Sequence, residues 1–409
     1  MTELEFVNII KSLGGRAFLV GGAVRDIFLK KKPKDRDYVI TGVSEKDFIR
    51  YFPDSEKVGN SFPVYLVDID GEMSEVAFAR KERKISSGYH GFEVSFDPSI
   101  TIEEDLFRRD TTMNSIALEL PDYTIIDPFN GRKDIDDKVI RATSKYFLQD
   151  PVRALRAARQ AAQHDFTIDK ETYVMMYMCK EELANEPSER ILLELDKAFK
   201  AARPSIFFTS LNKANILDVT FPEIFHLINI PSYSLKYKSK LDMFEYTMKV
   251  LDIVSSYTKD KVAKFCALSF GIESSIQNKR DKLQNIYFGY HTTGLMVLNN
   301  WDKRVILPKI WKKSASFIIE YHQIIPRLKD NESIVKLLLN LPKLTMSIQD
   351  FNYVIYGIHG FLPVYLEKAE YLIPELLKIT GKDVPSNIKG KAVGDYLLKL
   401  RAERLNELL

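Results

Sequence analysis

The segment Phe18-Leu-Val-Gly-Gly-Ala-Val-Arg-Asp-Ile-Phe28 decides the fold class of this 409-residue chain. Its first three residues are apolar and predict a buried strand, the pair Gly21-Gly22 follows, and Ala23–Leu29 predicts a short helix. A strand, two glycines and a helix N-terminus form an anion site, because glycines let backbone N–H groups approach a phosphate and the helix start adds positive potential. Arg25, in the first turns of that helix, can reach the same anion.

A second segment, Asp35-Arg-Asp37, follows a basic turn and leads into the apolar residues Tyr38–Ile40, which predict a strand. Because residues two apart in a strand point to the same face, we expect Asp35 and Asp37 to project together. Two carboxylates beside a phosphate site suit a pair of Mg²⁺ ions, since hard cations take oxygen ligands and two metals stabilise both oxygens of a phosphoryl transfer. Glu75, in a later predicted strand, is a candidate third carboxylate.

Each segment has a plainer interpretation when it is taken alone. A glycine pair fits an ordinary turn, and an Asp-x-Asp pair fits a solvated strand end, because short motifs match by chance. The two segments in this order and at this spacing favour a metal-dependent phosphate site.

Composition indicates a globular protein with room for several domains, since 45% of the residues are hydrophobic and 28% are charged. The net charge of +3 allows nucleic-acid binding, which only local clusters of basic residues can support. Cys179 and Cys266 are far apart, form no metal motif and fit a reducing compartment. We see no signal peptide and no apolar run long enough to cross a bilayer, so we expect a cytoplasmic protein with no membrane partner.

The pattern of the chain changes near residue 143. Before it, short helices and strands alternate, with helices predicted at Phe6–Leu13 and Ser44–Phe52 and strands at Val58–Val67 and Ser74–Ala79. After it, helical periodicity continues to the last residue, interrupted by prolines. The sequence therefore predicts an α/β part followed by an all-α part.

The stretch Ala79–Gly91 is basic and contains glycine. Beside an active site, such a loop can close over a triphosphate or steer an RNA end. An ordinary solvated hairpin loop is the alternative.

The stretch Arg108–Ser115 is a dense polar cluster. Arg108 and Arg109 suit phosphate contacts. Asp110 and Asn114 suit either ribose hydroxyls or the fixing of the arginines. The alternative is a capping cluster at a helix start.

The stretch Gln149–Arg159 predicts a helix, in which Asp150 caps the N-terminus and Pro151 takes the first position. Arginines recur every three residues and therefore lie along one helix face: Arg153, Arg156 and Arg159. One aspartate with several arginines is unusual for a solvated face, which mixes glutamate and lysine, although a capped solvated helix is the alternative.

Hydrogen-bond chemistry suggests a role for this helix face. Cytosine and adenine both present an amino donor beside a ring-nitrogen acceptor, so Asp150 can accept and Arg153 can donate. Guanine and uracil present a carbonyl and an N–H there. The pair would accept C and A and reject G and U without a nucleic-acid template. Arg156 and Arg159 remain for the triphosphate.

Together, these residues resemble the class II tRNA nucleotidyltransferases, the CCA-adding enzymes of the polymerase-β-like superfamily. The matching motifs stand in the family's order: Gly21-Gly22-x-x-Arg25-Asp26, Asp35-x-Asp37, Arg108-Arg109-Asp110-x-Thr112-x-Asn114, Asp150-Pro-x-Arg153-x-x-Arg156-x-x-Arg159 and the neck motif Ser188-Glu-Arg-Ile-x-x-Glu-Leu195. That combination is highly specific. The longer bacterial enzymes are the most similar subgroup.

The resemblance implies a polymerase-β-like head with a mixed sheet at residues 1–142, then an all-α neck with the nucleotide selector (143–210), a body (211–305) and a tRNA-binding tail (306–409). It implies Mg²⁺ on Asp35 and Asp37, with Glu75 beside them as the third candidate catalytic residue. The candidate nucleotide-binding residues are Gly22, Arg25, Arg109, Asp110, Asn114, Asp150, Arg153, Arg156 and Arg159.

The chain departs from the family pattern in three places. Gln149 stands where the family has a glutamate that orients the neighbouring arginine, and Ser115 replaces a small apolar residue. Longer relatives carry a His-Asp metal phosphohydrolase site in the body, but here Lys264–Gly271 occupies the place of its His-Asp doublet and Tyr246 that of a first histidine. The pair His164-Asp165 closes the selector helix and we interpret it as structural.

We therefore expect addition of CCA to the 3′ end of tRNA from CTP and ATP, with release of pyrophosphate. A poly(A) polymerase shares the head, but tends to carry an arginine-rich segment where Val58–Pro63 stands and a basic tail, neither of which this sequence has. An enzyme that adds only CC or only A is a second alternative, and retention of the Ala79–Gly91 loop argues against a CC-only enzyme. A non-catalytic RNA-binding protein is the third, against which the intact Asp35 and Asp37 argue.

Overall fold

The computed structural model describes the chain except for residues 34, 60–62, 85–91, 233–240 and 277–289. The part of the predicted basic loop at 85–91 thus lies outside the described residues. The chain forms two compact units, one of residues 1–194 with 209–220 and the other of residues 195–208 with 221–409. The finer division into head, neck, body and tail stays a prediction.

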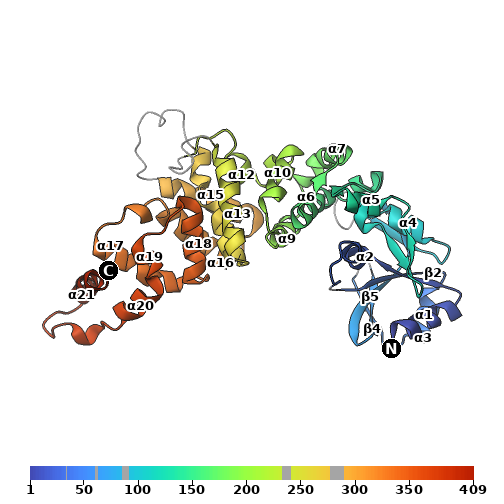
Figure 1. The fold of residues 1–409 in the computed structure, drawn as a ribbon, viewed down its shortest axis with the longest axis horizontal. Coiled ribbons are helices and arrows are strands. Elements are labelled where there is room, and N and C mark those ends of the chain that lie inside the picture. Colours follow the sequence, from blue (N-terminus) through green and yellow to red (C-terminus); the bar gives the residue numbers. More distant parts are fainter. Residues whose placement is uncertain (34, 60–62, 85–91, 233–240, 277–289) are drawn as a thin grey trace. The chain divides into compact units, whose positions relative to one another are not determined.

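A mixed sheet forms the N-terminal part of the first unit (Figure 1). Within the described residues its strand order is β3 (Glu56–Val58), β4 (Val64–Ile69), β5 (Glu72–Phe78), β2 (Asp37–Thr41), β1 (Arg16–Val20), β8 (Ala117–Glu119) and β9 (Thr124–Ile126). Strands β2 and β5 are parallel and the other neighbours are antiparallel. The predicted mixed sheet is confirmed.

The predicted phosphate turn joins β1 to helix α2 (Gly21–Phe28). Phe18 and Val20 of β1 are buried against Ile102 and Leu106, which fixes the end of the strand in the core. Gly21 adopts a φ of 68°, a left-handed conformation that favours glycine, and the chain turns there directly from strand into helix. The helix therefore begins at the glycine pair and not at Ala23 as the sequence suggested.

Asp35 does not lie in the strand that begins at Asp37, contrary to the prediction. Strand β2 begins at Asp37, which pairs with Val20, the last residue of β1. Because β1 ends there, Asp35 has no partner strand and lies before β2 in an exposed position.

The remaining elements of the first unit surround the sheet and continue into a helical region. They are α1 (Glu3–Ser12), α3 (Glu45–Tyr51), β6 (Arg80–Lys84), β7 (Phe92–Phe96), α4 (Ile102–Phe107), the 3₁₀ helix η1 (Thr112–Asn114), α5 (Gly131–Asp136), β10 (Val139–Ile140), η2 (Lys145–Gln149), α6 (Val152–His164), β11 (Thr167–Ile168), α7 (Lys170–Met178), α8 (Lys180–Leu183) and α11 (Leu217–Thr220). Helices α9 (Ser188–Ala198) and α10 (Ser205–Lys213) hold residues of both units. The helices predicted at Phe6–Leu13 and Ser44–Phe52 correspond to α1 and α3.

The regular elements described in the second unit are helices. They are α12 (Pro222–Phe225), α13 (Met243–Tyr257), α14 (Lys261–Ser269), η3 (Ile272–Ile276), α15 (Tyr290–Val305), α16 (Lys309–Tyr321), η5 (Ile325–Arg327), α17 (Asn331–Asn340), η6 (Leu341–Lys343), α18 (Ile348–His359), α19 (Val364–Glu367), α20 (Ala369–Leu377), η7 (Gly381–Asp383) and α21 (Lys391–Leu408). Among the described residues, no helix has both the length and the apolar character that crossing a membrane requires.

The residues that replace the phosphohydrolase motif are part of the helical core. Tyr246 on α13 is buried and donates its hydroxyl to the carbonyl of Ile358. Lys264 on α14 is buried and donates to the carbonyl of Phe199 at 2.6 Å. Their hydrogen bonds go to backbone carbonyls, so these side chains stabilise the packing of the unit.

Candidate active site

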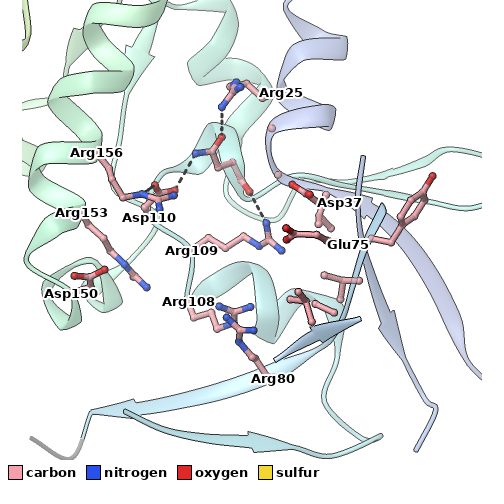
Figure 2. A pocket seen from close by; sticks show the side chains of 18 of the residues that line it. Arg25, Asp37, Glu75, Arg80, Arg108, Arg109, Asp110, Asp150, Arg153 and Arg156 are labelled. Atoms are coloured by element: carbon pink, nitrogen blue, oxygen red, sulfur yellow. Dashed lines mark hydrogen bonds and ion pairs between the residues drawn. The ribbon is translucent and has the colours of Figure 1, made fainter. Parts of the chain in front are cut away.

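A cavity of about 540 Å³ in the first unit brings most of the predicted site residues together (Figure 2). Its lining comes from the β1–α2 turn, strands β2, β4, β5 and β6, the segment after α4, and helices α6 and α9. The lining residues are Val20, Gly21, Gly22, Arg25, Asp37, Tyr38, Val39, Val64, Glu75, Ala77, Arg80, Arg108, Arg109, Asp110, Asn114, Asp150, Arg153, Arg156, Arg159 and Arg190. The many arginines give this cavity the charge of an anion site.

The glycine turn lies against the charged groups of the cavity. A Cβ atom on Gly21 would sit 3.5 Å from Nη1 of Arg109 and 3.5 Å from Oδ2 of Asp37. Arg25, one turn into α2, donates from Nη1 to Oδ1 of Asn114 at 3.1 Å and pairs with Asp26 at 2.8 Å. The backbone of the turn and the Arg25 guanidinium therefore lie at one wall of the cavity.

Two carboxylates face the cavity from adjacent strands. Asp37 of β2 and Glu75 of β5 are partners in the parallel ladder, and Figure 2 shows Arg109 pointing toward them. Burial raises the pKa of Asp37, and the negative charges of Glu75 and Asp35 raise it further, while Arg109 opposes them. Asp35 is near enough to act on Asp37 by its charge, yet it is absent from the cavity lining.

These carboxylates fit a divalent cation only together with a substrate. Within the described parts of the chain, no group of three or more His, Cys, Asp or Glu side chains is arranged to hold a metal ion. Mg²⁺ is usually bound by one or two carboxylates, with substrate phosphates and water completing the shell. Asp37 and Glu75, beside a phosphate turn, match that donor set.

Asp105 on α4 holds the two arginines of the polar cluster. Its carboxylate is fully buried and accepts from Arg108 at 3.0 Å and from Arg109 at 3.0 Å. Burial alone would raise the pKa of Asp105, but the positive charges of Arg108 and Arg109 lower it to about 2. Asp105 was not among the residues predicted from the sequence, although the spacing of three and four residues places such pairs on neighbouring turns of a helix.

Asp110 and Asn114 connect the polar cluster to helix α6. Asp110 Oδ2 accepts from Nε of Arg156 at 2.8 Å and from Gln160 at 3.0 Å, while Oδ1 accepts from Asn114 at 3.1 Å. Burial would raise the pKa of Asp110, but Arg156, Asn114 and Arg153 together lower it. Of the two roles considered for Asp110, the fixing of an arginine is the one that this geometry favours.

The two candidate base-reading residues lie on the same wall of the cavity. Asp150 precedes α6 and accepts a bidentate pair from Nη2 of Arg190 at 3.0 and 2.9 Å. Arg153, in the first turn of α6, donates from Nη1 to the carbonyl of Tyr146 at 2.8 Å. Arg190 was seen in the sequence only as part of the neck motif, and its position in the cavity was not predicted.

The start of helix α6 differs slightly from the prediction. The helix begins at Val152, one residue later than expected, with Pro151 before it. Asp150 still accepts from the backbone N–H of Val152 at 3.2 Å, so it has a capping contact as well as its pairing with Arg190. The Oε1 atom of Gln149 is buried and has no hydrogen-bond partner among the described atoms, so this amide oxygen does not orient Arg153.

Arg159 is the more enclosed of the two helix arginines predicted for the triphosphate. It donates from Nε to Glu194 at 2.5 Å and from Nη1 to Gln163 at 2.7 Å, and it lines the cavity. His164 is the last residue of α6, and Asp165 follows in a left-handed conformation. The pair closes the helix, as the sequence predicted.

Comparisons with known proteins give this site a family. Residues 17–141 match the Poly A polymerase head domain, and residues 165–227 match the probable RNA and SrmB-binding site of polymerase A. A multifunctional CCA protein of Shewanella frigidimarina (strain NCIMB 400) is 33% identical over 408 residues, which cover 96% of this chain and 97% of that protein. The chain belongs to the class II tRNA nucleotidyltransferases, the CCA-adding enzymes.

Solved structures of CCA-adding enzymes share the fold. The Bacillus stearothermophilus enzyme in complex with CTP is 22% identical, with a TM-score of 0.66, over 99% of this chain and 92% of that one. The Thermotoga maritima enzyme complexed with tRNA_CCA is 19% identical, with a TM-score of 0.61, over 98% of this chain and 90% of that one. This chain therefore has the fold of those proteins, a nucleotidyltransferase head followed by a helical remainder. The family generally uses a divalent metal.

Proposed function

We propose that this chain adds CCA to the 3′ end of tRNA from CTP and ATP, without a template and with release of pyrophosphate. The observation that carries the proposal is that Asp150 and Arg153 line the same cavity as Asp37 and Glu75. A nucleotide in this cavity would have its base near Asp150 and Arg153 and its phosphates near Asp37 and Glu75.

In this reaction the 3′-hydroxyl oxygen of the tRNA attacks the α-phosphorus of the nucleotide, a new P–O bond forms, and the bond to pyrophosphate breaks. The backbone N–H groups of the Gly21-Gly22 turn and the Arg25 guanidinium hold the phosphates. Arg109, fixed by Asp105, and Arg156, fixed by Asp110, stabilise the charge that develops on them. Their rigid positions mean that little reorganisation is needed when the reaction occurs.

The base is read by hydrogen bonds. Asp150 accepts from the amino group that cytosine and adenine share, and Arg153 donates to the neighbouring ring nitrogen. Arg190 holds both oxygens of Asp150 in one orientation, and the carbonyl of Tyr146 holds Arg153. A carbonyl of uracil or guanine in this place would leave the partly buried carboxylate of Asp150 facing an acceptor.

Mg²⁺ is the metal we propose, held by Asp37 and Glu75 with Asp35 nearby. When bound, it lowers the pKa of the attacking hydroxyl and neutralises charge on the leaving group. The cytoplasm is the proposed location, for which the buried free thiols of Cys179 and Cys266 give only general support.

One incubation separates this function from its alternatives. The full chain is mixed with tRNA that lacks its CCA end, with Mg²⁺ and with each labelled nucleotide in turn. We expect two cytidines and then one adenosine to be added, and no extension with UTP or GTP. A long adenosine tail would identify a poly(A) polymerase. Addition of C alone or of A alone would identify a partial enzyme. A chain that binds the tRNA but adds no nucleotide would be a non-catalytic RNA-binding protein.

A further inference from the structure

A second cavity, of about 330 Å³, lies next to the nucleotide cavity in the first unit. Three aromatic rings form its apolar part. Phe107 lies with its ring centroid 5.9 Å from Phe129 and 5.3 Å from Tyr146, and the latter ring is nearly perpendicular to it. Phe107 is 38% exposed, so part of its ring is open to a ligand.

The walls of this aromatic cavity and of the nucleotide cavity are connected in two ways. Arg108 lines both cavities. The backbone carbonyl of Tyr146 accepts from Arg153, one of the two base-reading residues. The aromatic cavity therefore lies on the side of the nucleotide cavity where the base is read.

The charges around the aromatic rings balance. Lys81 and Arg108 line the cavity with Glu103 and Glu104, and Lys81 pairs with Glu104 at 2.7 Å. Such a rim does not favour a phosphate, which the arginine-rich cavity beside it attracts. It suits a flat, neutral ring with amino groups that carboxylates can accept.

We propose that the aromatic cavity binds a nucleobase of the tRNA, one of the unpaired nucleotides at its 3′ end, by stacking on Phe107. This proposal rests on the proposed function, because the 3′-hydroxyl must reach the nucleotide cavity and its strand must pass beside it. Unpaired bases stack on aromatic side chains, while the arginine-rich nucleotide cavity beside this site attracts the phosphates of their backbone. The incoming nucleotide already has its own contacts at Asp150 and Arg153.

The first test compares Phe107→Leu with Phe96→Leu. Phe96 is a matched control, since it is 39% exposed in the same unit and lines neither cavity. We expect Phe107→Leu to raise the Kd and KM for tRNA on the order of tenfold, the loss that removal of a base–aromatic stack produces. The KM for CTP should not change, and Phe107→Trp should retain tight tRNA binding.

An equal tRNA Kd in the two leucine variants would overturn the proposal. So would a raised KM for CTP with unchanged tRNA binding, because the cavity would then serve the incoming nucleotide. If the wild-type chain binds tRNA but adds no nucleotide, the proposed function fails, while the Kd comparison still tests the stacking site.

A second measurement does not depend on the folding of a variant. 2-Aminopurine is placed in the tRNA either at the unpaired 3′ end or in the acceptor duplex, and its fluorescence is followed on binding to the wild-type protein. Stacking on Phe107 predicts that binding quenches the fluorescence of 2-aminopurine at the unpaired end more than that of 2-aminopurine in the duplex. Equal signals at both positions would contradict it.

Discussion

Arg156 on helix α6 donates its Nε to Oδ2 of Asp110 at 2.8 Å, and this ion pair joins the selector helix to the polar cluster that follows α4. Gln160, one turn further along α6, donates to the same oxygen and accepts from Thr111 at 2.8 Å. The attraction of Asp110 raises the pKa of Arg156, so this guanidinium keeps its positive charge in the cavity. Arg156 is thus a fixed cation whose charge is available to a phosphate.

We expect Arg156→Ala to lower kcat/KM for CTP and ATP by a similar factor, on the order of tenfold or more, because a hydrogen bond to a charged partner contributes about 1.5–3 kcal/mol. Nucleotide preference should stay the same, since phosphate is common to all four nucleotides. Steady-state kinetics with each nucleotide check this. A selective loss of C or A addition would show that Arg156 contacts the base.

Asp150→Ala should instead weaken discrimination against UTP and GTP, because no carboxylate then faces their carbonyls. We expect the ratio of kcat/KM values for CTP and UTP to fall on the order of tenfold or more. Arg190→Leu keeps the Asp150 carboxylate but removes the two hydrogen bonds that orient it. The ratio of kcat/KM values for CTP and UTP in Arg190→Leu should therefore lie between the ratios of the wild type and of Asp150→Ala. A uniform loss in Asp150→Ala would mean that the residue acts only through its contact with Val152.

The sequence predicted which segments form the site, but it did not predict how their side chains are held. The strand–glycine–helix turn follows from local patterns, because apolar runs, glycines and helix formers act over a few residues. The Asp37–Glu75 pairing depends on strand register between residues distant in sequence, and the exclusion of Asp35 from β2 depends on where the neighbouring strand ends. Partly buried ion pairs such as Arg190–Asp150 are tertiary contacts, which no local period reveals.

Asp37→Asn should abolish addition of both C and A. We expect kcat to fall by on the order of a hundredfold or more, which is the usual effect of removing a group that stabilises transition-state charge. Asp35→Ala should also reduce addition of both, since the negative charge of Asp35 near Asp37 adds to the attraction for Mg²⁺. Asp68→Asn, an exposed aspartate on β4, is the matched control. Near wild-type rates in the Asp37 variant, with an unchanged melting temperature, would refute the metal assignment.

We expect the wild-type chain to show no metal-dependent phosphodiesterase or phosphatase activity. The family resemblance places Tyr246 and Lys264–Gly271 where longer relatives have the metal site, and both Tyr246 and Lys264 donate to backbone carbonyls. The measurement is hydrolysis of a 2′,3′-cyclic nucleotide with Ni²⁺ or Mg²⁺. Robust hydrolysis that disappears on mutation of residues between Tyr246 and Gly271 would contradict the expectation.

Asp105 gives a prediction about stability and pH. Its pKa is about 2 in the folded chain against an ordinary 3.8, because Arg108 and Arg109 outweigh the effect of burial. A carboxylate whose pKa is lowered by folding stabilises the protein at pH values above its pKa in the unfolded chain. This contribution is lost as the pH falls toward its pKa in the folded chain. Asp105→Asn should therefore destabilise the first unit at neutral pH, and about 2 kcal/mol of that difference should vanish as the pH falls from 4 to 2.

The measurement for Asp105 must report on the first unit, because both tryptophans, Trp301 and Trp311, belong to the second. Hydrogen exchange of peptides from α4, followed in urea at several pH values, localises the unfolding to the segment that holds Asp105. Asp122→Asn, an exposed aspartate, is the control and should follow the wild type at every pH. If the difference between Asp105→Asn and the wild type were the same at pH 3 as at pH 7, the charge of Asp105 would contribute nothing to stability, and its role in fixing Arg108 and Arg109 would have to be purely steric.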